Sequence, residues 1–336
     1  MVESKHVNVI AEIGVNHDGY LDKAKRLIEA AKLAGADAVK FQSFDSSKLV
    51  TARARKVSYQ RRDRGSSTHQ EMLQRLELSR DDQQEIFRFC GEIGIEFMST
   101  PYGLSELEFL LQLGIERIKL ASADITDIPL QEAAAASGKI SLVSTGMADI
   151  SEITRVVGIH DPSNLCLLVC TSSYPTEPND VRIRRITLLR EKFRVPVGFS
   201  DHSESETSAI AAIALGASVV EKHLTLDRND DGPDHLASYS PREFAHYVQS
   251  IREAEKVLSG DTFGASENEL EMQLISRKSV HLASSLRRNE RLELRHLTLM
   301  RPNEGLGWYE AVAMIGSRAT CDLAEGHPLR AENFRK

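Results

Sequence analysis

The sequence predicts an α/β protein, a (β/α)8 TIM barrel followed by a small C-terminal β-rich domain. Eight short apolar runs alternate with helix-like segments up to about residue 258, and after Arg277 the pattern changes to short strands and turns. A strict strand-then-helix order indicates a parallel sheet. Eight such strands within about 250 residues favour a closed barrel over an open, doubly wound sheet.

The expected strands are rich in β-branched residues and lie at 7–14, 38–42, 95–100, 117–122, 140–146, 165–172, 195–202 and 218–225. Amphipathic segments separate them. A helix is expected over 21–35, with apolar residues on one face and Gly35 at its end. A second is expected over 81–94, with Ser79 as its N-cap and Gly94 at its end.

The domain boundaries follow from the change in pattern. We expect a barrel over 1–260, a linker over 261–276 and a small β-rich domain over 277–336. A domain of that size builds only a marginal core, so it is expected to pack on the barrel or on another subunit. The connection 43–80 is unusually long and polar, which is typical of a lid or a binding loop.

Composition excludes several classes of protein. The 336 residues carry 42 basic and 49 acidic side chains, a formal net charge of −7, with no long basic block for nucleic acid. No apolar run is long enough to span a membrane. The four cysteines show no zinc or CxxC spacing, and Cys166 and Cys170 are expected to be small core residues of a reducing compartment. We therefore expect a cytoplasmic protein.

Polar residues occupy the end of every expected strand, although the strand starts are apolar. In chain order they are Glu12, Lys40, Gln42, Ser99, Thr100, Lys119, Ser122, Asp124, Ser144, Thr145, Thr171, Ser172, Tyr174, Ser200, Asp201, His202, Glu221, Lys222 and His223. In a (β/α)8 barrel the carboxyl ends of the strands open into the active site. Convergence of eight polar ends on one mouth predicts a functional site.

The residue types at this mouth indicate the chemistry. Lys40 and Lys119, together with several hydroxyls, suit an anion that carries phosphate and carboxylate groups. No Walker loop or GxGxxG motif is present, so no nucleotide cofactor is expected. His202 and His223 could share a divalent metal, Mn²⁺ or Mg²⁺, or serve as hydrogen-bonding core residues. Glu12 is a candidate general base or a structural partner of a lysine.

Two further motifs do not support a function. The segment 227–232 matches half of an EF-hand loop, but its twelfth position is Ser238 and no helix precedes it. The consecutive Ser200, Asp201 and His202 cannot form a hydrolase triad, because neighbours in a strand point to opposite faces. By the same rule Glu221 and His223 share a face, and Lys222 lies on the other.

The chain resembles the sialic acid synthase family, which includes N-acetylneuraminate, legionaminate and pseudaminate synthases. The resemblance covers essentially the whole chain and rests on AEIGVNHDG (11–19), GADAVKFQ (35–42), STP (99–101), STGM (144–147), SDH (200–202), EKHLTLD (221–227) and GPDH (232–235). The tail is similar to the antifreeze-like (SAF) domain of that family, with Arg301-Pro302 in the matching place.

This resemblance implies a metal-dependent condensation of phosphoenolpyruvate with an N-acylated hexose, giving a nine-carbon 2-keto acid and phosphate. It implies that phosphoenolpyruvate is held by Lys40, Thr100, Lys119, Ser122, Ser172 and Ser200. It assigns the metal to His202 and His223, the proton of the attacking water to Glu12, and the sugar to Gln42, Tyr174 and Asp234. Arg301 would reach the active site of a partner subunit in a domain-swapped homodimer.

The sequence departs from the family at several positions. Where many members have GSGE or GSGD, this chain has ASAD (121–124), so Asp124 takes the place of the acid. Some members have Asn at the position of Ser172. An asparagine that often contacts the sugar's acyl group is replaced by the stretch Arg61, Arg62, Asp63 and Arg64. LVT (49–51) favours the neuraminate and legionaminate branch, whereas TSSYP (171–175) also occurs in the pseudaminate branch.

Two other functions remain open at this point. One is a different barrel aldolase or lyase that forms a Schiff base on Lys40 or Lys119. The other is a sugar-acid binding protein without catalysis. Glu12 separates the two classes, because a binding protein needs no general base.

Overall fold

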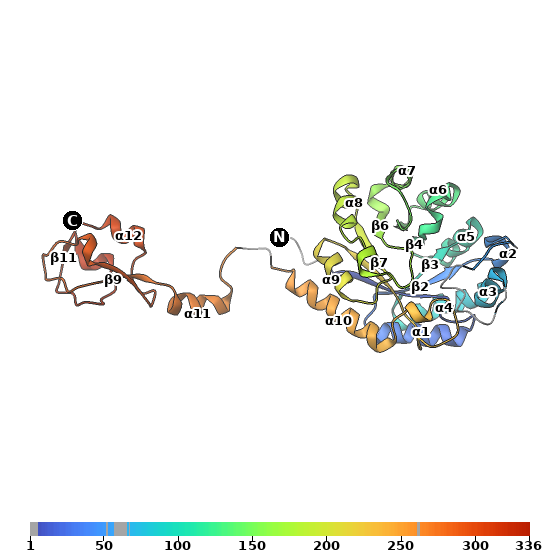
Figure 1. Cartoon of the computed structure of the whole chain (residues 1–336), viewed down its shortest axis with the longest axis horizontal. Helices are drawn as coiled ribbons and strands as arrows, with labels where there is room; N and C mark the ends of the chain where they lie inside the picture. Colours follow the sequence, from blue (N-terminus) through green and yellow to red (C-terminus); the bar gives the residue numbers. More distant parts are fainter. Residues whose placement is uncertain (1–5, 52, 57–65, 67, 261–262) are drawn as a thin grey trace. The chain divides into compact units, whose positions relative to one another are not determined.

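The computed structural model describes residues 6–51, 53–56, 66, 68–260 and 263–336. The chain forms two compact units, residues 1–261 and 262–336. Figure 1 shows the first as a ring of strands surrounded by helices.

The strands of the first unit form a closed parallel barrel, with each strand paired to the next and β8 paired to β1. They are β1 (Asn8–Gly14), β2 (Ala38–Ser43), β3 (Glu96–Pro101), β4 (Arg117–Leu120), β5 (Ile140–Ser144), β6 (Leu165–Val169), β7 (Val197–Asp201) and β8 (Val219–His223). The predicted barrel and its eight strands are confirmed.

Helices connect and surround these strands (Figure 1). They are α1 (Leu21–Leu33), α2 (Ser46–Leu49), α3 (His69–Leu76), α4 (Arg80–Ile93), α5 (Leu104–Leu113), α6 (Ile128–Ala136), α7 (Ile150–Ile159), α8 (Arg185–Phe193), α9 (Thr207–Ala214) and α10 (Pro241–Val257). The predicted ends of α4 are confirmed: the Ser79 side chain accepts from the Asp82 backbone N–H, and Gly94 has a left-handed φ of 70°.

Alternate strand residues build two separate cores. One set faces outward against the helices, for example Val9, Ala11 and Val39. The other set forms a cluster of its own, consisting of Ile10, Ala38, Met98, Leu142, Cys166, Leu168 and Val219. These residues precede the polar strand ends, so apolar packing fills the interior on the amino-terminal side. Only the carboxyl ends of the strands are left to form a cavity.

The second unit contains α11 (Glu267–Ser276), β9 (Ser279–Leu282), β10 (Leu297–Met300), α12 (Trp308–Ala313), β11 (Arg318–Ala319) and β12 (Phe334–Arg335). Its strands form two small antiparallel pairs. Its core is small: Val280, Leu282, Leu286, Leu292, Leu297, Ala311, Ala319, Leu323, Leu329 and Phe334. The part of the chain expected to be a linker contains α11, none of whose described residues is buried.

Within the ranges given above, none of the helices is long and apolar enough to cross a membrane.

The barrel predicts a sharp response to one added methyl group. A Cβ at Gly198 in β7 would lie 2.6 Å from Leu168 Cδ2 and 2.6 Å from the Val219 carbonyl oxygen. Gly198→Ala should therefore lower the free energy of unfolding by about 1–3 kcal/mol through overpacking. Gly91→Ala is the control, because a Cβ there meets no described atom within 4 Å and Ala is the better helix former. Equal urea midpoints for Gly198→Ala and the unmodified protein would contradict the packing described.

Candidate active site

A cavity of about 460 Å³ opens at the carboxyl ends of the barrel strands. The structure brings together there the predicted site residues Glu12, Lys40, Gln42, Thr100, Lys119, Ser122, Ser172, Tyr174, Ser200, His202, His223 and Asp234. They lie at or just after the ends of seven of the eight strands, and Ser144 at the end of β5 also lines the cavity; Asp234 lies in the loop after β8. Parallel closure of the barrel is what makes residues so far apart in sequence neighbours.

Two lysines and two glutamates occupy the floor of this cavity. Lys40 Nζ lies 2.6 Å from Glu12 Oε2 and 3.9 Å from Glu221 Oε2, and it donates to Thr100 Oγ1 at 3.2 Å. All of these side chains are buried. A buried charge is stable only when an opposite charge or hydrogen bonds compensate it. Here the carboxylates of Glu12 and Glu221 compensate the buried ammonium of Lys40.

The two carboxylates differ in their tendency to hold a proton. Burial raises the pKa of Glu12 to about 7, against the opposing attraction of Lys40. Burial also acts to raise the pKa of Glu221, but Lys40 and Lys119 outweigh it and hold that pKa below its usual value. Glu12 is thus the carboxyl suited to exchange a proton near neutral pH, and Glu221 is the one that stays ionised.

The lysines also differ. Burial acts to lower the pKa of Lys40, but the carboxylates of Glu12 and Glu221 raise it overall, so this ammonium stays charged. Lys119 donates to the Leu120 carbonyl at 3.0 Å, and burial lowers its pKa. An anion that entered the cavity would stabilise the charged form of Lys119, which burial destabilises in the free protein.

His202 and His223 face each other, with ring centroids 5.5 Å apart. His202 Nδ1–H donates to the Thr171 carbonyl at 2.8 Å, which leaves its Nε2 as the unprotonated nitrogen. Burial lowers the pKa of His202 to about 4 and that of His223 well below its usual value. Both rings are therefore neutral, the form that binds metals.

Tyr174 and Asp234 border the histidines. The Tyr174 ring lies 4.2 Å from that of His202 and 5.8 Å from that of His223, measured between centroids. Asp234 Oδ2 is 3.8 Å from His223 Nδ1, and burial raises the pKa of Asp234 to about 6. His223 Nδ1 is buried and has no hydrogen-bond partner among the described residues.

Side-chain alternation places Lys222 on the other face of β8 from Glu221 and His223, as predicted, and it places Asp201, which was expected at the barrel mouth, on the outer face as well. Lys222 Nζ is 3.5 Å from Asp201 Oδ2, hydrogen-bonds to the Ser203 carbonyl and lies 4.2 Å from the Tyr239 ring centroid. Tyr247 in α10 donates to Asp201 Oδ2 at 2.9 Å. Ser200 instead faces inward and donates to Glu221 Oε1 at 2.8 Å, so no Ser-Asp-His relay exists.

The acidic loop after β8 is held by a lysine. Asp18, Asp230 and His235 lie close enough together to hold a metal ion. Lys23 Nζ, however, donates to Asp18 at 2.5 Å and to Asp230 at 2.6 Å. The ammonium supplies the positive charge that a cation would bring to this cluster.

The cavity has an apolar wall that was not predicted from the sequence. It is formed by Val15, Phe44, Leu49, Val50, Met72, Leu73, Leu76, Tyr102 and Met147. Most of it comes from the long connection 43–80, including α3, and forms a small cluster of its own. The helical spacing of Met72, Leu73 and Leu76 was the available signal, but the polar character of the connection hid it.

Cys170 corrects one expectation. The sequence analysis treated it as a small core hydrophobe, like Cys166. Cys170 is buried, but it lines the cavity, and its Sγ lies 3.0 Å from Ser122 Oγ. Alternation along the chain places Cys170 on the same inward face as Cys166 and Leu168, and the apolar run around it concealed this.

Two predicted site residues are not among those that line the cavity in the described part of the chain. Asp124 lies beside it, in the turn after β4: Gln131 donates to its backbone carbonyl, and burial followed by repulsion from Asp127 raises its pKa to about 6. Arg301 is exposed and belongs to the second unit. The segment Arg61, Arg62, Asp63 and Arg64 lies outside the described residues.

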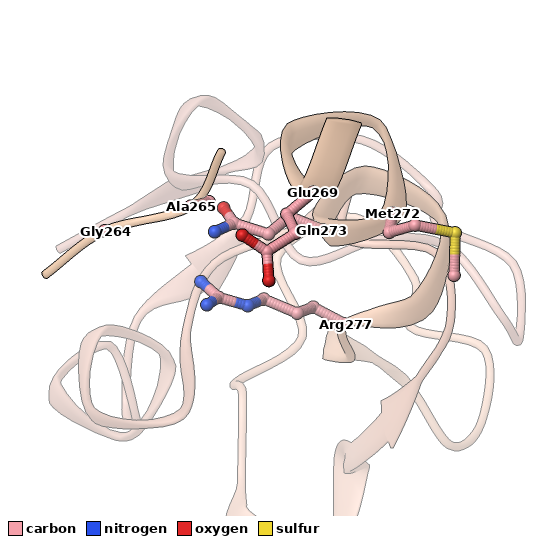
Figure 2. A pocket seen from close by; sticks show the side chains of 6 residues that line it. All are labelled: Gly264, Ala265, Glu269, Met272, Gln273 and Arg277. Carbon is pink, nitrogen blue, oxygen red and sulfur yellow. The ribbon is translucent and has the colours of Figure 1, made fainter. Parts of the chain in front are cut away.

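The second unit has one open hollow, shown in Figure 2, lined by Gly264, Ala265, Glu269, Met272, Gln273 and Arg277. Its acidic residue is already engaged, because Glu269 accepts from the Ser266 backbone and hydroxyl at the start of α11. Its lining residues are exposed or half-exposed. The barrel cavity is the better candidate for chemistry.

Comparison with known proteins agrees with this geometry. The chain is 39% identical over 334 residues to the N,N'-diacetyllegionaminic acid synthase of Legionella pneumophila, covering 97% of this chain and 94% of that protein. It is 38% identical over 257 residues to the N-acetylneuraminate-9-phosphate synthase of Homo sapiens, covering 76% and 72%.

Among solved structures, it is similar to the N-acetylneuraminic acid (sialic acid) synthetase of Leptospira borgpetersenii in complex with citrate. The TM-score is 0.71 at 33% identity, covering 80% of this chain and 90% of that one. The model of the NeuB family matches residues 27–262. The predicted family resemblance is thereby confirmed, and the chain belongs to the NeuB family.

Proposed function

We propose that the protein is a nonulosonic acid synthase that condenses phosphoenolpyruvate with an N-acylated hexose. The observation that carries this proposal is the buried cavity in which two lysines, two glutamates and a pair of neutral histidines converge. Membership in the NeuB family supports the same reaction. The products would be a nine-carbon 2-keto acid and inorganic phosphate.

Phosphoenolpyruvate is a compact anion with a phosphate and a carboxylate, and the floor of the cavity suits it. Lys40 and Lys119 provide positive charge, and the hydroxyls of Thr100, Ser122, Ser172 and Ser200 provide donors. Burial lowers the pKa of Lys119, and a bound anion would raise that pKa again by stabilising the ammonium form.

A divalent metal fits beside this floor. His202 Nε2 is left unprotonated by the Nδ1–H bond to Thr171, and His223 is neutral and within reach of Asp234. His202 and His223 would hold the ion, with Mn²⁺ or Mg²⁺ the expected choices. Bound there, a divalent cation would polarise the aldehyde oxygen of the open-chain sugar.

The remaining steps fall to residues of the chain. The enol carbon of phosphoenolpyruvate forms a bond to the aldehyde carbon, and the C=O electron pair moves to the aldehyde oxygen, which takes up one proton to become a hydroxyl. This leaves positive charge on the carbon that bears the phosphate, and the proton taken up is balanced by the one that water loses in the next step. Water adds to that carbon, and Glu12, whose pKa is raised to about 7, accepts its proton. Loss of phosphate then gives the 2-keto acid. Glu221 stays ionised and stabilises the positive charge of Lys40 throughout.

The sugar is expected to lie above this floor, against Gln42, Tyr174 and Asp234. Gln42 Nε2 donates to Glu12 Oε1 at 3.1 Å, so it links the sugar side of the cavity to the proposed base. The apolar wall offers a surface for the methyl group of an N-acyl substituent. A 2,4-diacetamido hexose is our first choice of substrate, with N-acetylmannosamine second, because of the similarity to the legionaminic acid synthase.

The second unit is proposed to act in a domain-swapped homodimer. Its apolar side chains Leu270, Met272, Leu274 and Ile275 on α11 are exposed, as is Tyr309 on α12, which suits an interface. In such a dimer Arg301 would add a positive charge to the anion site of the partner subunit.

The function is tested by incubating the protein with Mn²⁺, phosphoenolpyruvate and a panel of 2-acetamido and 2,4-diacetamido hexoses. Phosphate release and a nine-carbon acid in the mass spectrum are expected with at least one sugar. Glu12→Gln should lose turnover, because the proton acceptor is removed. The substitution also removes the carboxylate that pairs with Lys40, so phosphoenolpyruvate binding and circular dichroism on the variant serve to show that the site is still formed. No product across the panel would refute the synthase.

One alternative has a specific observation in its favour, since the lowered pKa of Lys119 also suits a Schiff-base lysine. Borohydride trapping of a keto acid on Lys119, together with activity that survives EDTA, would support that aldolase instead. Equal function of Glu12→Gln and the unmodified protein would indicate a binding protein without catalysis.

The metal assignment predicts that His202→Ala and His223→Ala each weaken Mn²⁺ binding by at least about tenfold while the fold is kept. Isothermal titration calorimetry measures the affinity, and circular dichroism checks the fold. His235→Ala is the matched control, because that histidine lies in the lysine-occupied cluster. Mn²⁺ affinity unchanged in both cavity variants would disprove the assignment.

The dimer predicts complementation between two inactive variants. Glu12→Gln lacks the base and Arg301→Ala lacks the residue donated to the partner, so a mixed dimer contains one intact site. Refolding the two variants together in equal amounts should restore about a quarter of normal activity, because half the dimers are mixed. No gain on mixing, with each variant folded, would show that Arg301 does not act across subunits.

A further inference from the structure

Three polar γ atoms converge on the backbone of Gly146, just after β5. An added Cβ at Gly146 would lie 2.6 Å from Ser172 Oγ, 2.7 Å from Ser122 Oγ and 2.9 Å from Cys170 Sγ. We call these four residues the Gly146 corner. Its three side chains line the substrate cavity. The two serines were expected to hold phosphoenolpyruvate, whereas Cys170 was expected only to be a small core residue.

The hydrogen bonds of the corner centre on Ser122. Its Oγ accepts from the Gly146 backbone N–H at 3.0 Å, and it lies 3.0 Å from Cys170 Sγ. A hydroxyl has one proton to donate and two lone pairs to accept with. One lone pair of Ser122 Oγ already accepts from the Gly146 N–H. The direction of the hydrogen bond with Cys170 therefore determines whether the hydroxyl proton or the second lone pair is left for a ligand.

A thiol can take either role in this bond. In the free protein the Ser122 hydroxyl can donate to Cys170 Sγ, which is only a weak acceptor. When an anionic oxygen enters the corner, a bond from the hydroxyl to that oxygen is stronger, because charge-assisted hydrogen bonds exceed neutral ones. The Cys170 S–H can then turn and donate to the second lone pair of Ser122, which fixes the hydroxyl proton toward the ligand.

We propose that Cys170 is a positioning residue for phosphoenolpyruvate, acting through the hydroxyl of Ser122 in the Gly146 corner. This inference rests on the proposed function. Cys170 suits the role because it can either donate or accept, so the bond to Ser122 is kept in the free and the bound state. Glycine at 146 is required in this arrangement, because a Cβ there would clash with Ser172 Oγ, Ser122 Oγ and Cys170 Sγ and push the three side chains apart.

The experiment measures phosphoenolpyruvate affinity by titration calorimetry, without any sugar, for the full-length protein and three variants. Cys170→Ala should raise Kd by about 3–10-fold, the equivalent of one hydrogen bond. Cys170→Ser keeps a group that donates and accepts, so its Kd should stay within about threefold of normal. Cys90→Ala is the matched control, because Cys90 is equally buried but lies on α4, away from the cavity.

Steady-state kinetics give a second readout. Cys170→Ala should raise the KM for phosphoenolpyruvate and leave the KM for the sugar unchanged, which a general loss of packing would not do. Competition by inorganic phosphate and by pyruvate, each alone, then tells which end of phosphoenolpyruvate the corner receives. The competitor whose affinity falls in Cys170→Ala carries the matching group.

Normal phosphoenolpyruvate affinity in Cys170→Ala would overturn the inference, as would a Cys170→Ser variant as weak as Cys170→Ala. A Cys90→Ala variant that loses as much affinity would show that the effect is one of stability alone. If the unmodified protein itself fails to bind phosphoenolpyruvate, the proposed function fails, and that result is distinct from either of these.

Discussion

The ion pair between Lys40 and Glu12 is the constraint on which the rest of the site depends. Both groups are buried at the end of the barrel, and their atoms lie 2.6 Å apart. Removing either partner would leave an uncompensated buried charge, which costs about 3–5 kcal/mol. Glu221 Oε2 lies 3.9 Å from Lys40 Nζ and also stabilises the ammonium, and Ser200 donates a hydrogen bond to Glu221 Oε1. Among the described residues, Lys119 has no carboxylate within ion-pair distance, so it is the lysine of the floor that is available to an incoming anion.

The same strand ends carry a second buried network on their outer face. Lys222 and Asp201 are both fully buried, and Tyr239 and Tyr247 surround them between the barrel and its helices. This network ties the end of β7 to the end of β8 and to α10. His202 and His223 follow directly in the chain, so the outer network fixes the backbone from which both inward histidines project. The ionisable residues at the end of β8 therefore have two roles: Glu221 and His223 line the cavity, and Lys222 belongs to the outer network.

Much of this was predictable from period-two alternation and from the polar strand ends. Those rules predicted the barrel, the inward Glu12, Lys40 and His223, and the outward Lys222, because strand geometry alone determines them. What the sequence could not reveal depends on contacts between distant segments. The contact of Lys23 with the acidic loop and the contact between Cys170 and Ser122 each join residues whose spacing carries no signal. The residues of α3 have a helical spacing, but that spacing does not show that they face the cavity. Asp124 shows the converse, since a polar strand end can turn aside from the cavity.

The cavity has two chemically distinct sides, and this limits how substrates can lie in it. An anion loses its hydration when it enters the cavity. Only Lys119 and the hydroxyls of the floor offer charge and hydrogen bonds in place of the lost water, so binding of an anion against the apolar wall is unfavourable. A neutral N-acylated sugar can lie against that wall without such a cost. In the proposed reaction the two substrates are therefore sorted by charge. Because a metal at His202 and His223 would polarise the aldehyde of the sugar, the aldehyde must lie beside the histidines while it faces the enol carbon of phosphoenolpyruvate.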